Sequence, residues 1–120
     1  MICIDKSKYM EHLDNEYSYN LQLNCVRSYC RAKLKSNPKN VIGLVAMGGK
    51  MKTFEPTSDL DIIFRQLKYY LGARYVIGGE LNFMSALISC GFELSNYPDD
   101  KYLKRIIFFL GGYVFVVCYA

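Results

Sequence analysis

Two stretches decide the fold of this chain, Met1-Ile-Cys-Ile-Asp-Lys-Ser-Lys-Tyr-Met10 and Lys35-Ser-Asn-Pro-Lys-Asn-Val-Ile-Gly-Leu-Val-Ala-Met-Gly-Gly-Lys-Met-Lys52. The first is a short apolar run that ends on Asp5, with Ser7 two residues later. The second holds a turn at Asn37-Pro38, because the residue before a proline is pushed out of the helical region, and then another apolar run. Runs without a polar face are typical of central parallel strands. An acid at the carboxyl end of such a strand lies where open α/β sheets place their ligand or partner site.

Strands and helices alternate along the rest of the sequence. We expect strands at residues 2–5, 41–47, 50–54 and 105–110, and helices at residues 15–36, 57–71 and 80–90. This order predicts a mostly parallel sheet with helices on both faces. The pair Gly111-Gly112 is a hairpin signal, so we expect Tyr113 to Tyr119 to return as an antiparallel edge strand.

Helix boundaries and faces follow from local signals. The first helix has an apolar stripe at helical spacing, which predicts its buried face: Leu21, Cys25, Tyr29 and Ala32, widened by Val26. The second helix has Thr57 or Ser58 as its expected N-cap, with Asp59 and Asp61 in the first turn, where the helix dipole favours acids. We expect Gly91 to end the third helix.

Composition restricts the class of protein. At 120 residues the chain has the size of one domain, and we expect residues 1–120 to form it. The 15 Lys and Arg only slightly outnumber the 11 Asp and Glu, and a solvated helix end explains much of the excess better than a nucleic-acid surface does. Five cysteines without a C-x-x-C pair predict reduced core thiols. Residues 106–120 are apolar but too short and β-branched for a membrane span, and we expect no secretory signal in the opening.

Three motifs carry a resemblance to a known family. They are Cys3-Ile-Asp-Lys-Ser-Lys-Tyr-Met10, Ser36-Asn-Pro38 before Val41-Ile-Gly-Leu-Val45, and Arg105-Ile-Ile-Phe-Phe-Leu-Gly111. In this order and at these spacings they resemble the von Willebrand factor A domain of the multiubiquitin-receptor subunit of the 26S proteasome regulatory particle. The likeness covers about residues 2–112 and implies a von Willebrand A-like, Rossmann-type α/β fold. Since that family continues with a further helix and strand, the domain is expected to be shortened at its C-terminus.

The family's metal motif is incomplete. A-domains hold a divalent cation with Asp-x-Ser-x-Ser, a threonine from a second loop and an aspartate from a third. Asp5 and Ser7 match the first two positions, but the third is Tyr9. The threonine position falls around Gly78-Gly79, and a Leu110-Gly-Gly sequence follows the fourth strand. Because hard cations need several converging oxygens, we expect no metal and no other cofactor. The carboxylate of Asp5 is instead expected to cap its loop, and the loop, with Asp5, Ser7 and Tyr9, to bind a protein partner.

The resemblance implies a role in ubiquitin-dependent protein degradation, in cytoplasm and nucleus. The chain would be a non-catalytic subunit that docks on proteasome lid subunits and helps hold lid to base. Ubiquitin-interacting motifs of the family are acidic helices centred on Ala-x-x-x-Ser, and the matching spacing here, Ala32 to Ser36, lies in a basic helix. Polyubiquitin would thus be bound only through a segment absent from these residues.

Two alternatives stay open on the sequence. The first is a metal-dependent nucleotidyltransferase, in which Gly48-Gly49 would contact phosphate and Asp59 and Asp61 would bind metal. Against it, the residues after the glycines are strand-like, and Asp59 and Asp61 suit a capped helix on which they diverge. The second is an A-domain scaffold of another nuclear complex, such as TFIIH.

Overall fold

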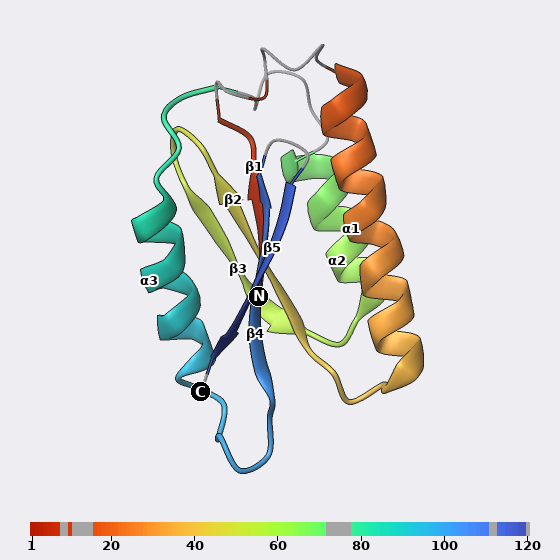
Figure 1. Ribbon diagram of the computed structural model, residues 1–120. Coiled ribbons are helices and arrows are strands. Elements are labelled where there is room, and N and C mark those ends of the chain that lie inside the picture. The colour runs from red at the N-terminus through yellow and green to blue at the C-terminus, as the bar shows by residue number, and fades with distance from the viewer. Residues whose placement is uncertain (8–9, 11–15, 72–77, 111–112, 120) are drawn as a thin grey trace.

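The computed structural model of the chain describes residues 1–7, 10, 16–71, 78–110 and 113–119. Its elements are β1 (Ile2–Asp5), α1 (Glu16–Ser36), β2 (Ile42–Met47), β3 (Lys52–Thr57), α2 (Leu60–Gln66), η2 (Leu67–Leu71, a π-helical turn that continues α2), α3 (Phe83–Leu94), β4 (Lys104–Leu110) and β5 (Tyr113–Tyr119). Together they make a three-layer α/β sandwich (Figure 1).

The sheet has five strands in the order β3-β2-β1-β4-β5. The three central strands β2, β1 and β4 are parallel, with Cys3 opposite both Val45 and Phe108. Both edges are antiparallel, since β3 pairs with β2 and β5 pairs with β4 from Lys104–Tyr119 to Leu110–Tyr113. The expected parallel centre and the expected C-terminal hairpin are therefore both confirmed.

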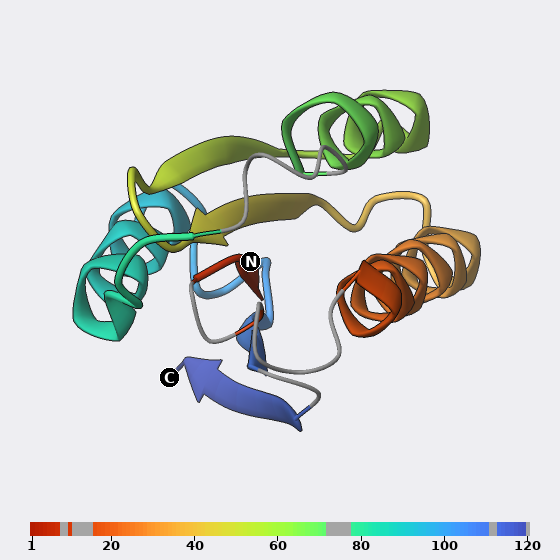
Figure 2. The same ribbon diagram turned by 90° about the horizontal axis from the view of Figure 1, so that it is seen from above.

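Helices cover both faces of the sheet, as Figure 2 shows from above. Because side chains alternate along a strand, each central strand contributes to two cores. Ile2 and Ile4 point towards α1 and α2, whereas Cys3 points towards α3. Figure 1 shows that the carboxyl ends of the three parallel strands share one end of the sheet, so the loops that follow β1 and β2 meet there.

The buried face of α1 differs from the expected stripe. Leu21 is 50% exposed, and Cys25 and Ala32 are also exposed. The face against the sheet is instead formed by four side chains at intervals of four, three and four, namely Tyr19, Leu23, Val26 and Cys30. Both sets satisfy the helical period, and only the packing against the sheet selects between them. The expectation that all cysteines are core residues is thus wrong for Cys25.

Three element boundaries also differ from the expected ones. Strand β3 begins and ends later than expected and includes Pro56. An edge strand tolerates proline because one of its sides has no neighbouring strand to accept a hydrogen bond. Asp59, not Thr57 or Ser58, caps α2 by accepting from the backbone N–H of Asp61. Helix α3 runs from Phe83 through Gly91 to Leu94, because the Asn82 side chain caps its start and Gly91 keeps a negative φ.

Candidate functional site

Asp5 ends β1 and is almost fully buried, with 2% of its surface exposed. Its Oδ1 atom accepts a hydrogen bond from the backbone N–H of Ser7 at 2.8 Å. Ser7 then accepts at its carbonyl from the N–H of Met10 at 3.0 Å, and Met10 is fully buried in the core under α1. The carboxylate therefore caps the loop as expected. Tyr9, the third residue of the predicted docking loop, lies outside the described residues.

Backbone hydrogen bonds join this loop to the two loops beside it. The Lys6 N–H donates to the Met47 carbonyl at 2.7 Å, and the Lys6 carbonyl accepts from the Gly78 N–H at 2.8 Å. The Gly49 N–H donates to the Glu80 carbonyl at 3.2 Å. The segments 5–7, 47–49 and 78–80 thus form one bonded cluster at the carboxyl ends of β1 and β2, which we call the loop cluster.

Glycines allow the loops to approach this closely. Gly48 has a φ of +115° and Gly79 a φ of +78°, which L side chains rarely adopt. A Cβ on Gly48 would lie 2.7 Å from the Ser7 Cα, and one on Gly79 would lie 2.3 Å from the Gly49 Cα. Backbone therefore packs on backbone where the resemblance placed the second-loop threonine.

Helix α1 bonds to the neighbouring backbone through two residues that sequence reasoning missed, one at the loop cluster and one at the end of η2. The Gln22 Nε2 atom donates to the Asp5 carbonyl at 3.1 Å. Tyr19 donates its hydroxyl to the Leu71 carbonyl at 2.6 Å, at the end of η2. Burial, and next the charge of Asp5, raise the pKa of Tyr19. Gln22 is a polar residue on the buried, apolar face of α1, and this position could have indicated its role. The sequence alone did not show which face of the helix is buried.

Two buried oxygens in this region, the Ser7 Oγ and the Gln22 Oε1, have no hydrogen-bond partner among the described residues. The donor set nevertheless does not fit a divalent cation, which needs several hard oxygen ligands. Asp5 is the one carboxylate that the motif supplies, and Gly78 and Gly79 bring no side-chain oxygen. Within residues 1–7, 10, 16–71, 78–110 and 113–119, no group of three or more His, Cys, Asp or Glu side chains is placed to hold a metal.

Comparisons with known proteins give sequence relatives and a structural neighbour. No protein-family model matches the chain. It is 33% identical over 115 residues to the 26S proteasome non-ATPase regulatory subunit 4 homolog of Oryza sativa subsp. japonica, and 34% identical over 115 residues to that of Arabidopsis thaliana. Both alignments cover 93% of this chain. The crystal structure of the SpRpn10 VWA domain superposes with a TM-score of 0.69 at 19% identity, covering 92% of this chain and 58% of that chain.

This chain is a homologue of the von Willebrand A domain of proteasome regulatory subunit 4. It spans 27% of the rice relative and 28% of the Arabidopsis relative. The relatives are named as non-ATPase regulatory subunits, and the expectation of a non-catalytic chain agrees with them.

The regulatory-subunit-4-like domain does not present the nucleotidyltransferase arrangement. That reading needs a helix directly after Gly48-Gly49 and a strand that carries both aspartates. Instead, the glycine turn leads into β3, and Asp59 and Asp61 are exposed at the start of α2. The Asp59 Oδ1 atom accepts a hydrogen bond from the Asp61 N–H at 2.9 Å, which is a capping role.

No helix in the described part of the chain is long and apolar enough to cross a membrane.

Proposed function

We propose that residues 1–120 act as one non-catalytic docking domain that binds proteasome lid subunits and strengthens the association of lid and base. The working surface is the loop cluster, with Asp5 and Ser7 holding its shape, and Tyr9 is the third residue that we expect to contribute to partner binding. The protein then belongs to the ubiquitin-dependent degradation pathway of cytoplasm and nucleus. Polyubiquitin is bound only through a segment outside these residues.

The observation that carries the proposal is the internal use of the Asp5 carboxylate. It caps the loop through the Ser7 N–H, while backbone hydrogen bonds join three loop segments that contain four glycines with a positive φ. A surface held in this way is preorganised, which lowers the entropy lost when a partner binds. Similarity to the plant regulatory subunits supports the choice of partner.

Binding of the purified chain to isolated lid subunits tests the proposal. We expect Asp5→Ala to weaken binding by about 1–3 kcal/mol, the usual cost of leaving a buried donor unpaired. Asp61→Ala is the matched control, because it removes one carboxylate from an exposed position away from the loop cluster. Tyr19→Phe is the second control, since it weakens the fold without touching the Ser7 bond.

Undiminished lid binding by the Asp5 variant would show that the docking surface lies elsewhere. Equal losses for Asp5→Ala and Tyr19→Phe would show that only stability is being measured. Tight binding of ubiquitin chains by these 120 residues would contradict the assignment of ubiquitin recognition to another segment.

A further inference from the structure

A surface cavity lies at the end of the sheet opposite to the loop cluster. It is open to solvent, has a volume of about 590 Å³, and is lined by the C-terminal ends of α1 and α3, the turn at residues 37–41, and the start of β4. Figure 1 shows these segments at the same end of the molecule, near the amino ends of the parallel strands, with α1 and α3 on opposite sides of the sheet. The volume is within the range of sites that hold a drug-sized molecule or a few residues of peptide, ~300–1,000 Å³.

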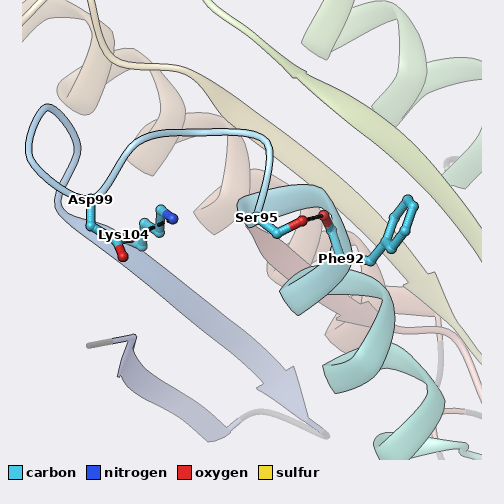
Figure 3. A network of polar contacts seen from close by, with 4 residues as sticks. All are labelled: Phe92, Ser95, Asp99 and Lys104. Atoms are coloured by element: carbon cyan, nitrogen blue, oxygen red, sulfur yellow. Dashed lines mark hydrogen bonds and ion pairs between the residues drawn. The ribbon is translucent and has the colours of Figure 1, made fainter.

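The walls of this cavity are cationic. Five basic side chains line it and no carboxylate does: Lys33, Lys39, Lys101, Lys104 and Arg105. Lys104 is 8% exposed, and its Nζ atom pairs with the Asp99 Oδ1 at 2.6 Å, as Figure 3 shows. No ion pair is found for the other four among the described residues. Among the described residues, four of the five cations that line the cavity therefore have no ion-pair partner.

Its floor is apolar and its rim is aromatic. Ile2, Ile42 and Ile107 from the three parallel strands lie at the bottom. Tyr97 and Tyr102 stand edge to face on one side, with ring centroids 5.1 Å apart. Tyr29 lies on the other side, where the Lys33 ammonium is 6.0 Å from its ring centroid.

The arrangement distinguishes between kinds of anion. Compact phosphate groups are usually held by backbone N–H groups at a helix N-terminus. Here α1 and α3 both present their C-terminal ends, so in the described part of the chain no helix N-terminus lines the cavity to hold a phosphate. Lysines spread around an apolar floor suit carboxylates spaced along an extended chain, with apolar side chains between them.

We propose that this cavity docks a short acidic segment of a partner protein, in which glutamate or aspartate alternates with large apolar residues. The carboxylates pair with Lys33, Lys39, Lys101 and Arg105, and the apolar side chains occupy the isoleucine floor. The charge complementarity of walls and segment selects the partner. Since the site is at the far end of the sheet from Asp5, it stands or falls independently of the docking function above.

Fluorescence anisotropy with the whole chain tests the site. The probe is a labelled octapeptide that alternates glutamate with leucine, and we expect saturable binding that weakens as salt is raised. Lys33→Glu should weaken binding roughly five- to tenfold, because a rim ion pair becomes a repulsion. Lys101→Glu, from another wall, should act similarly. Asp99→Asn should strengthen binding, because it releases the charge of Lys104.

Lys35→Glu is the matched control, with the same charge change in the same last turn of α1 but outside the cavity lining. Its affinity should stay within about twofold of the native chain because only short-range contacts escape salt screening. A glutamate–serine octapeptide should bind more weakly, since it lacks the side chains for the floor.

Three results would overturn the proposal. The first is an equal loss for Lys35→Glu and Lys33→Glu, which would indicate a diffuse field. The second is tighter binding of ATP or inorganic phosphate than of the glutamate–leucine peptide, which would indicate a phosphate site. The third is the absence of saturable peptide binding while circular dichroism shows the native fold.

Discussion

Replacing Gly79 by alanine should destabilise the domain sharply, because the loop cluster has no room for one more carbon. The new Cβ would lie 2.3 Å from the Gly49 Cα and 2.4 Å from the Gly49 nitrogen, and these backbone atoms cannot rotate away. The φ of +78° adds strain for any L side chain, on the order of 1–2 kcal/mol. Overpacking of a filled site adds typically about 1–3 kcal/mol. We therefore expect Gly79→Ala to cost about 2–5 kcal/mol.

Urea denaturation and calorimetry measure this cost. For a chain of this size, each kcal/mol lowers Tm by about 4 °C, so the expected shift is roughly 8–20 °C. Gly91→Ala is the control, since Gly91 lies inside α3 without a positive φ. An added methyl there should stabilise the helix by about 0.5–1 kcal/mol. A loss below about 1 kcal/mol for Gly79→Ala would refute the close contact of the two glycine loops.

Three further predictions concern stability at alkaline pH, the cap of α2 and nucleotide transfer. Stability should fall as pH rises above about 9–10, since burial raises the pKa of Cys30 to about 11 and also that of Tyr19, so the unfolded chain loses these protons first. Tyr19→Phe should lower the free energy of unfolding by about 1 kcal/mol at pH 7 and make the decrease of stability with pH less steep. An unchanged pH profile in this variant would contradict the role of Tyr19. Asp59→Ala should cost about 1 kcal/mol in urea denaturation, as loss of an N-cap does, whereas Asp61→Ala should cost less. Neither native chain nor variants should transfer labelled nucleotide in the presence of Mg²⁺, and transfer abolished by Asp61→Asn would restore the enzyme hypothesis.

Local chemistry alone predicted the central strands and the hairpin. Strands β1, β2 and β4 are continuous apolar runs, and such runs can be buried only in the middle of a covered sheet. The Gly111-Gly112 pair before a β-branched run was enough to predict the pairing of β5 with β4. Helix α3 differs from the expected range because Gly91 continues the helix instead of ending it, and because the Asn82 side chain caps its start.

Which face of a helix is buried is a property of the sheet it packs on, and this limited the prediction of the site. The stripes that contain Leu21 and Tyr19 have the same period in the sequence, yet only the second faces β1 and brings Gln22 to the Asp5 carbonyl. The basic residues of the cavity come from positions as far apart as Lys33 and Arg105. The sequence by itself determined an acid at the end of the first strand and an incomplete metal motif, because both depend on residues close together in the chain. Tertiary structure decided the close packing of backbone in the loop cluster and the cationic cavity at the other end of the sheet. Each of them is formed by segments that are far apart in the sequence and meet only in the folded chain.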